Sequence, residues 1–357
     1  MTINSVIRTP LIENSGMWFG PEGGYWSNIK RSDNTEYLKD IEGLGSVGTV
    51  RKYFKGHEDV IFSPKRAGGL AGLDISDNDL VLDAGCMWGA LTVPLARTGA
   101  TVVGMDQTEE SLRLLEKRKR EEALSNLHIV CADLRKIELH EGVFDKIIVN
   151  GVLEWVPETE HVEVGAFRKN GGIWGNLRAL PGKLREREVS PVEVQRDLLL
   201  KLNHAMKDDG TLYLAIENRY DFFYFLGMPE QHSGMRFVAF MPRWMQDAMS
   251  LIFRGRRFRT WTHSKRGLVR LLKSAGFEEC DVYYGFPDYL NPELVISDKG
   301  MEHYRYVRSA GKKPLWKKAI LRAIEHVVFK SMKMTFLAPS LIVHARKGNV
   351  TGRGGRS

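Results

Sequence analysis

The stretch VLDAGCMWGALT, residues 81–92, decides the fold class of this chain. An apolar run ends in Asp83, a turn with Gly85 and Gly89 follows, and a helix is predicted to begin at Leu91. A turn of this kind brings backbone N–H groups and a helix N-terminus close to a ligand. NAD enzymes and purely structural turns use the same pattern, so further signals are needed to identify the ligand.

The pattern of a short apolar strand followed by a helix repeats after this stretch. Alternation of this kind predicts a parallel sheet with helices on both faces, and right-handed crossovers make it doubly wound. We therefore predict an α/β, Rossmann-like, seven-stranded sheet with helical and loop insertions. The predicted strands are 80–82, 101–105, 127–131, 144–149, 211–216, 280–286 and 340–346, and the predicted helices include 91–96, 109–123, 198–206 and 264–274.

Polar residues follow the predicted strands at their carboxyl ends, where ligands bind in open α/β sheets. Asp106 ends the second strand, and an acidic residue there can accept hydrogen bonds from a ribose diol. Asp133 follows the third strand and can accept a hydrogen bond from an adenine amino group. Asp83, Asn150 and the pair Glu217–Asn218 lie at the same predicted edge.

The ordered set VLDAGC (81–86), VVGMD (102–106), CADL (131–134) and FDKIIVNGVLEW (144–155) resembles the motifs of class I S-adenosylmethionine-dependent methyltransferases. Met87 departs from the family, which usually has a glycine there. The alternatives are an NAD-type domain and a non-catalytic Rossmann-like module. The resemblance implies S-adenosylmethionine as cofactor, held by Asp83, Gly85, Cys86, Gly89, Asp106, Gln107, Asp133, Leu134 and Asn150.

The second half of the chain carries a narrower resemblance. The segments 215–234, 262–277 and 284–297, with GVLEWV at 151–156, resemble bacterial methyltransferase modules found with surface-polysaccharide glycosyltransferases. This implies O-methylation of a sugar or of a glycan-linked acceptor, which can be lipid-linked. A small-molecule O-methyltransferase, an RNA methyltransferase and a non-catalytic binding module remain alternative functions.

Methyl transfer to a hydroxyl requires a group that takes up its proton. His232 is the first candidate for this base and Glu217 the second, and a loop histidine or a helix-capping glutamate is the alternative for each. Glu154, Trp155, Asn218 and Arg219 are predicted to bind the acceptor, although Trp155 can equally pack in the core. The three cysteines are far apart in the sequence and form no CxxC pair, and we predict no metal site.

The sequence outside the core predicts the remaining organisation. Aromatic residues near the N-terminus, among them Trp18 and Trp26, suggest either a lid or a plain packing role, and the glycine-containing stretch 161–190 is predicted to be a loop. We predict an N-terminal extension or lid (1–78), a cofactor-binding core (79–217), a substrate-side insertion (218–260), a C-terminal part of the core (261–347) with a basic amphipathic helical insertion at about 300–335, and a disordered tail (348–357).

Charge and composition bear on location and partners. Residues 251–357 hold 22 Lys and Arg against 8 Asp and Glu, within a chain of net charge +8. A basic region of this kind favours an anionic partner such as phosphate or an acidic membrane surface. The sequence shows no secretory signal and no apolar run of membrane-spanning length. We expect a cytoplasmic protein, peripheral at the inner membrane face or free, with no nucleic-acid partner and with homo-oligomerisation left open.

Overall fold

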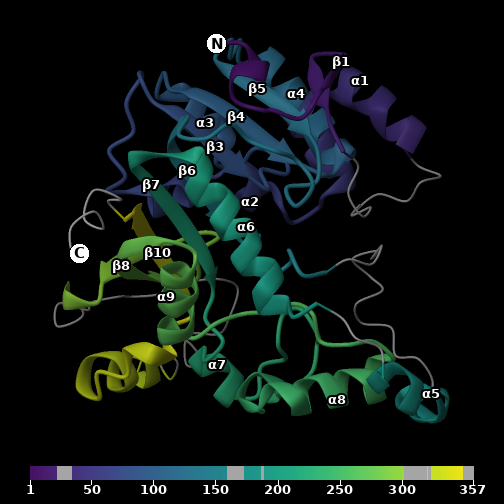
Figure 1. The fold of residues 1–357 in the computed structure, drawn as a ribbon, viewed down its shortest axis with the longest axis vertical. Helices are drawn as coiled ribbons and strands as arrows, with labels where there is room; N and C mark the ends of the chain where they lie inside the picture. Colours follow the sequence, from purple (N-terminus) through teal and green to yellow (C-terminus); the bar gives the residue numbers. More distant parts are fainter. Residues whose placement is uncertain (22–33, 159–172, 186–188, 301–319, 321–322, 349–357) are drawn as a thin grey trace, which may run out of the picture.

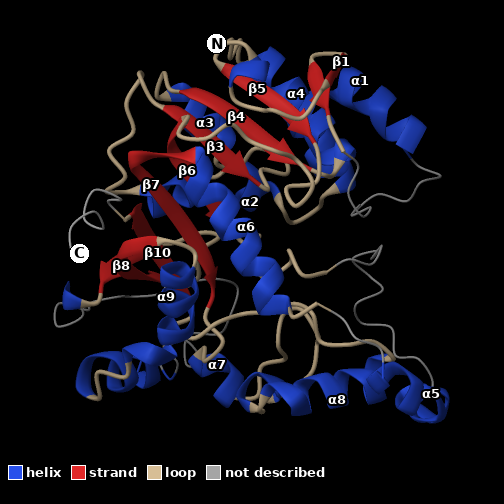
Figure 2. Cartoon of the chain, viewed as in Figure 1, coloured by secondary structure: helices blue, strands red, loops and turns tan. Residues whose placement is uncertain are grey.

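The computed structural model describes residues 1–21, 34–158, 173–185, 189–300, 320 and 323–348. Its centre is a single ten-stranded sheet, shown in red in Figure 2. The strands lie in the order β1-β2-β5-β4-β3-β6-β7-β10-β8-β9. Their bounds are β1 Ile12–Asn14, β2 Met17–Phe19, β3 Leu80–Ala84, β4 Thr101–Asp106, β5 Leu127–Cys131, β6 Phe144–Asn150, β7 Met206–Glu217, β8 Phe277–Phe286, β9 Leu294–Ser297 and β10 Ser340–Lys347.

The seven predicted strands form the middle of this sheet, from β5 to β8. Strands β5, β4, β3, β6 and β7 are parallel neighbours, and β10 enters antiparallel between β7 and β8. The prediction of seven strands missed three short edge strands: β1 and β2 extend the sheet beyond β5, and β9 extends it beyond β8. The predicted Rossmann-like class I fold is confirmed.

Helices cover both faces of the sheet, as Figure 1 shows for the upper part of the molecule. The α-helices are α1 Asn34–Tyr53, α2 Glu58–Phe62, α3 Thr92–Arg97, α4 Glu109–Glu121, α5 Ile173–Arg185, α6 Pro191–Ala205, α7 Phe222–Phe225, α8 Arg243–Arg254 and α9 Lys265–Ser274. Short 3-10 helices span Ile3–Ser5, Pro64–Leu70, Val238–Phe240 and Thr335–Leu337, and a π-helical turn spans His326–Ser331.

Alternation along the strands divides the core into two layers. Val81 and Val102 pack with α3 and α4 on one face, while Leu82 and Val103 pack with α6 and α9 on the other. All four side chains are fully buried. Because every strand of the parallel part is covered on both sides, its apolar runs are continuous rather than alternating with polar residues.

One prediction about the insertions needs correction. The stretch 161–190 is not a loop throughout, because 173–185 form α5 despite Gly175 and Gly182. This helix is anchored on α8, where the Asn176 amide donates to the carbonyl of Ile252 and Lys183 donates to the carbonyl of Gly255.

Much of the predicted basic helix at about 300–335 lies outside the described residues, and so does the predicted disordered tail except residue 348. No helix in the described ranges is long and apolar enough to cross a membrane.

Candidate active site

The carboxyl ends of the parallel strands open onto one cavity of about 560 Å³. Its walls come from the turn after β3, the ends of β4, β6 and β7, the segment after β5, and the segment between α1 and β3. Seven of the nine predicted cofactor residues line it, and the other two, Asp83 and Gly89, do not. The predicted cofactor residues in its wall are Gly85, Cys86, Asp106, Gln107, Asp133, Leu134 and Asn150.

The glycine turn is built around the carboxylate of Asp106. The backbone N–H groups of Gly85 and Cys86 both donate to the carbonyl of Met105, which ties the turn to the end of β4. The N–H of Met87 donates to Asp106 Oδ2 at 3.0 Å, and the N–H of Thr108 donates to Oδ1 at 2.8 Å. Burial raises the pKa of Asp106, and these backbone N–H groups oppose the rise.

Backbone conformation and packing both require glycine at positions 85 and 89. Both have positive φ, 83° and 77°, a region that side-chain-bearing residues rarely adopt. A Cβ on Gly85 would lie 2.2 Å from the Val152 side chain, and one on Gly89 would lie 2.2 Å from the Leu115 side chain. Met87 also has positive φ, 44°, and its side chain lines the cavity and packs beside Trp88 without filling the space.

The three aspartates predicted to hold the cofactor have different surroundings. Asp106 lines the cavity, whereas Asp83 lies behind it, where its carboxylate accepts a 2.6 Å hydrogen bond from Thr92 Oγ1. Burial raises the pKa of Asp83 to about 6. Asp133 lines the cavity, but both of its carboxylate oxygens are bound by the Arg135 guanidinium, the closest at 2.7 Å.

The segment N-terminal to β3 supplies part of the cavity wall. His57, Val60 and Arg66 line the cavity from this side. With the Asn150 amide turned so that its oxygen faces Arg66, that oxygen accepts from the guanidinium at 3.0 Å. Of the aromatic residues that suggested a lid, Trp18 lies in β2, and Trp26 lies outside the described residues.

A cluster of buried ionisable side chains lies next to the end of β7. Glu154, Glu217 and His232 come from the loop after β6, the last residue of β7 and the loop before Val238, and their exposed fractions are 0%, 7% and 4%. One ligand atom from each, two carboxylate oxygens and one ring nitrogen, lies within 4.8 Å of the other two. Sequence reasoning named all three residues but did not place them together.

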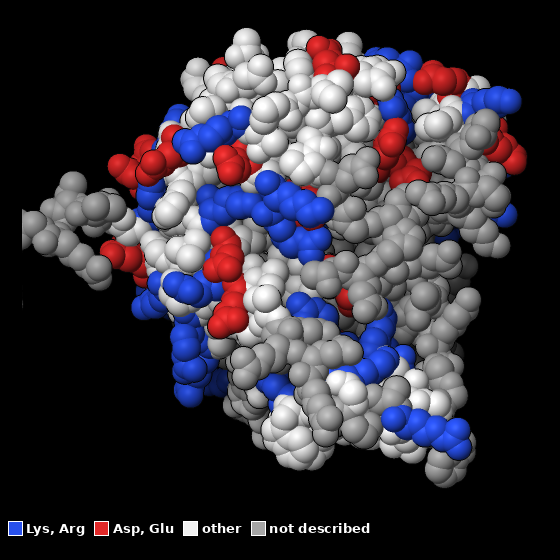
Figure 3. Space-filling model, turned by 45° about the vertical axis from the view of Figure 1, so that its right-hand side comes forward, with Lys and Arg blue, Asp and Glu red and all other residues white. Residues whose placement is uncertain are grey.

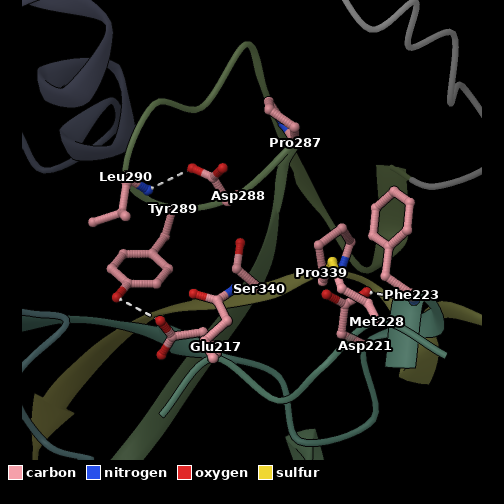
Figure 4. A pocket seen from close by; sticks show the side chains of 11 residues that line it. Glu217, Asp221, Phe223, Met228, Pro287, Asp288, Tyr289, Leu290, Pro339 and Ser340 are labelled. Carbon is pink, nitrogen blue, oxygen red and sulfur yellow. Dashed lines mark hydrogen bonds between the residues drawn. The ribbon is translucent and has the colours of Figure 1, made fainter. Parts of the chain in front are cut away.

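Two residues that the sequence did not indicate complete this cluster. Glu230 Oε1 lies 2.6 Å from His232 Nδ1, and the Tyr289 hydroxyl donates to Glu217 Oε1 at 3.0 Å (Figure 4). Tyr289 lies far from Glu217 along the chain, so no local pattern relates the two residues. Glu230 lies in the same short loop as His232, two residues before it. This spacing was the signal in the sequence from which their contact could have been predicted.

The charges in the cluster are strongly coupled. Burial alone would lower the pKa of His232, but the carboxylates of Glu230 and Glu217 outweigh it and raise the pKa to about 9. Burial opposes ionisation of Glu230, yet the neighbouring imidazolium lowers the pKa of that carboxyl to about 2. Burial, followed by the Glu217 carboxylate, raises the pKa of Glu154 well above its usual value.

The predicted acceptor-binding residues separate into two groups. Trp155 lines the cavity, and its ring lies edge-on to His232 with centroids 4.7 Å apart. Asn218 and Arg219 do not line it and instead anchor loops. The Asn218 amide donates to the carbonyls of Phe336 and Ala338, and the Arg219 guanidinium donates to those of Ala239 and Met241.

A second cavity of about 260 Å³ adjoins the first. Glu217, Gln231, Tyr289 and Leu290 line both cavities, so they form the partition between them. Figure 4 shows Glu217 and Tyr289 at this partition, with Asp221 and Asp288 on the side of the smaller cavity. The larger cavity thus connects the glycine turn with a region rich in carboxylates.

Residues 81–169 match the family model described as "Methyltransferase domain". The chain therefore contains a methyltransferase domain. The matched segment starts at β3 and includes the glycine turn, Asp106, Asp133 and Glu154. Together with the cavity, this match confirms the predicted methyltransferase domain and S-adenosylmethionine as its cofactor.

Curated relatives are similar to the same part of the chain. The mitochondrial ubiquinone biosynthesis O-methyltransferase of Mus musculus is 32% identical over 83 residues, which is 22% of this chain and 22% of that protein. The ubiquinone biosynthesis O-methyltransferase of Escherichia coli O7:K1 is 33% identical over 98 residues, 28% of this chain and 38% of that protein. The matches thus span less than two fifths of these relatives' length.

The solved structures to which the chain is similar include methyltransferases at low sequence identity. The phosphoethanolamine N-methyltransferase 2 of Haemonchus contortus, with phosphomonomethylethanolamine and S-adenosylhomocysteine bound, is 12% identical and has a TM-score of 0.45. That similarity covers 87% of this chain and 59% of the other.

Proposed function

We propose that the whole chain is an S-adenosylmethionine-dependent O-methyltransferase whose acceptor is a sugar or a glycan-linked hydroxyl. The observation that carries the proposal is the course of the larger cavity. It joins the glycine turn and Asp106, at the end of β4, to Glu217 and His232, at and beyond the end of β7. Two strands, β3 and β6, separate β4 from β7, so the two ends are about 14 Å apart at a spacing of ~4.8 Å per strand.

The end of the cavity at β4 fits an adenosyl group. Asp106 keeps accepting capacity at both carboxylate oxygens after taking one N–H each, which suits the two hydroxyls of a ribose. Ala132 and Leu134 offer an apolar wall for the adenine base. At Gly85 the backbone itself forms part of the wall, because a side chain there would clash with Val152. When bound there, S-adenosylmethionine supplies an electrophilic methyl carbon.

The end of the cavity at β7 fits an acceptor that loses a proton. Glu217 and His232 are the predicted proton acceptors, and both line the cavity. Because the neighbouring carboxylates raise the pKa of His232 to about 9, this side chain already holds a proton at neutral pH, and the proposal assigns the base to Glu217. The aromatic face of Trp155 beside them can orient a sugar ring or another flat group. Holding the hydroxyl in line with the methyl carbon is the main task of this part of the chain, because positioning supplies much of the rate enhancement in such displacements.

Carboxylate-rich walls favour a polyhydroxylated acceptor. The smaller cavity is lined by Asp221, Asp288 and Glu217, and no Lys or Arg is among its lining residues. Acceptor-only side chains of this kind suit hydroxyl donors and disfavour a phosphate at that position. The smaller cavity therefore provides room for the part of the acceptor that lies beyond the methylated hydroxyl.

The exposed apolar residues near α7 and α8 support a lipid-linked acceptor or a membrane surface. Trp244 on α8 is 70% exposed, Phe225 on α7 is 52% exposed, and Phe237 is 50% exposed. The lowest part of the face in Figure 3 carries mainly Lys and Arg among its charged side chains. Exposed aromatic residues beside basic side chains are typical of proteins that dock on anionic lipid.

The test is methyl transfer from radiolabelled S-adenosylmethionine to a panel of acceptors. The panel contains free and lipid-linked saccharides, sugar nucleotides, catechols and ribosomal RNA. The proposal expects label in the saccharide fraction, and expects Asp106→Ala to abolish it. Label in the catechol fraction alone would favour a small-molecule O-methyltransferase, and label in RNA alone would contradict an O-glycan acceptor.

A further inference from the structure

The outer atoms of the buried cluster are held by hydrogen bonds. Glu230 fixes His232 through Nδ1 at 2.6 Å, so the other ring nitrogen, Nε2, faces the carboxylates. The Tyr289 hydroxyl holds Glu217 through Oε1 at 3.0 Å and lies 3.5 Å from Glu154 Oε1. Each of the three side chains is therefore oriented through one of its two polar atoms.

The remaining atoms of the same three side chains converge on one another. Glu154 Oε2 and Glu217 Oε2 are fully buried and have no hydrogen-bond partner within the described residues. His232 Nε2 lies 3.8 Å from Glu217 Oε2, which is too long for a hydrogen bond. Buried polar atoms are normally paired, so two unpartnered carboxylate oxygens facing one imidazole nitrogen call for a bound group.

We propose that Glu154, Glu217 and His232 bind a divalent transition-metal ion through Glu154 Oε2, Glu217 Oε2 and His232 Nε2. The sequence analysis predicted no metal site on the basis of the three distant cysteines, and Glu154, Glu217 and His232 come from three separate segments that share no ligand spacing. Ligands bound at about 2.1 Å lie about 3–4.2 Å from one another. The present spread of up to 4.8 Å therefore requires only a small contraction of the two flexible glutamate side chains.

The second set of hydrogen bonds has the form found around metal ligands. A histidine that binds a metal through one ring nitrogen usually donates from the other to a carboxylate or carbonyl, and ligating carboxylates are hydrogen-bonded in turn. Glu230 and Tyr289 have these two roles here. Both contacts fix the orientation of the proposed ligands.

The donor set selects the kind of ion. Two carboxylates and one imidazole suit Mn²⁺, Fe²⁺ or Zn²⁺, whereas Mg²⁺ and Ca²⁺ prefer oxygen ligands throughout. Three protein ligands leave open positions for an oxygen of a further ligand. Glu217 and His232 line the cavity, so the open side faces the proposed acceptor. This last step rests on the proposed function, whereas binding of the metal does not.

The alternative is a metal-free network in which a protonated His232 and a proton on the Glu154 carboxyl together balance the charges of the cluster. The two arrangements differ in an observable way. A network in which protons neutralise the carboxylates has no position for a metal ion and therefore gives no stoichiometric metal binding. A metal site binds one ion per chain and loses it when any of the three ligand atoms is removed.

The experiment is a Mn²⁺ titration of the chelator-treated full chain, followed by the electron paramagnetic resonance of free Mn²⁺ and by calorimetry. Zn²⁺ serves as a competitor and Mg²⁺ as the control ion. We expect one Mn²⁺ per chain, displaced by Zn²⁺ and not by equimolar Mg²⁺. Glu154→Gln, Glu217→Gln and His232→Gln should each weaken binding at least tenfold, because each replaces a carboxylate or imidazole ligand by a neutral amide, which is a weaker ligand for these ions.

Asp221→Asn is the matched control. Asp221 is a buried carboxyl next to the cluster, and its Oδ1 accepts from the N–H of Phe223, a bond that asparagine can keep. This variant should bind Mn²⁺ as the natural chain does. Circular dichroism and S-adenosylmethionine binding report whether each variant is folded.

Three outcomes distinguish a failure of the metal site from a failure of the proposed function. A folded wild-type chain that binds S-adenosylmethionine but neither Mn²⁺ nor Zn²⁺ overturns the metal site and leaves the proposed function intact. Ion binding that survives all three ligand substitutions also overturns it. Stoichiometric Mn²⁺ binding without binding of S-adenosylmethionine supports the metal site and contradicts the proposed function.

Discussion

The backbone N–H of Met87 donates a 3.0 Å hydrogen bond to the carboxylate of Asp106. The class I methyltransferases that the sequence resembles usually have glycine at this position. The contact explains how this chain can have methionine there instead. The interaction uses the backbone and the positive φ of 44°, and the Met87 side chain is not needed for it. The glycine turn and the carboxylate of Asp106, which we propose binds the ribose, therefore form one unit.

Met87→Gly should keep cofactor binding. Glycine retains the N–H that binds Asp106 and adopts positive φ without the penalty of about 1 kcal/mol that a side chain carries there. We expect the Kd for S-adenosylmethionine, measured by calorimetry, to change less than about threefold. A tenfold or greater loss would mean that the Met87 side chain itself holds the cofactor.

Gly85→Ala should destabilise the protein because its new methyl group would meet Val152. Positive φ and overpacking together should cost about 2–4 kcal/mol in the free energy of unfolding. Urea unfolding monitored by circular dichroism measures this cost. The double variant Gly85→Ala/Val152→Ala should recover part of it, because the Val152 atoms 2.2 Å from the added Cβ are gone. Additive losses in the two variants would show that the clash is not with Val152.

His263 should make stability fall in mild acid. Burial, together with the charges of Arg243 and Arg219, lowers the pKa of His263 to about 3, and its Nε2 lies 2.7 Å from the Gln195 amide oxygen. The folded state thus binds fewer protons than the unfolded state below pH 6.5. The contribution of His263 is complete above that pH and is lost as the pH falls toward 3, by up to about 1.4 kcal/mol per pH unit.

The measurement is urea unfolding of the natural chain and of His263→Gln between pH 7.5 and pH 4.5 on a ~1 unit grid. Glutamine has no group that titrates in this range and keeps an N–H donor for Gln195. The difference in unfolding free energy between the two chains should narrow below pH 6.5. Parallel curves across the whole range would show that His263 is not held neutral by the fold.

Trp244 should contribute to binding of anionic lipid. Its side chain is 70% exposed on α8, so Trp244→Ala should leave the fold and S-adenosylmethionine binding unchanged. Co-sedimentation with vesicles containing anionic lipid should fall at least about threefold in the variant, since a Trp ring contributes apolar area at the interface. Equal sedimentation with neutral and anionic vesicles would remove the membrane proposal.

Strand positions were predictable because apolar runs and the residues that end them are local properties of the sequence. Asp106, Asn150 and Glu217 were placed correctly at strand ends for this reason. The direction of each side chain was not predictable. Glu217 lines the cavity, whereas the adjacent Asn218 is fully buried and holds the segment 336–338.

Contacts between distant segments explain the rest of what sequence reasoning missed. Tyr289 reaches Glu217 only because β8 and β10 bring the loop after Phe286 beside the end of β7. Similarly, α5 forms at 173–185 although its glycines and proline favour a loop, because α8 provides hydrogen-bond partners for it. Neither tertiary contact leaves a periodic signal in the sequence.

Calorimetric titration of S-adenosylmethionine into the natural chain and into Asp106→Ala tests the central claim most directly. The account predicts one cofactor molecule per chain, with affinity lowered at least about tenfold in the variant, because the carboxylate that accepts the ribose hydroxyls is lost. Circular dichroism must show that the variant is folded. Absence of binding to the natural chain, or equal affinity in a folded Asp106→Ala, would contradict the account.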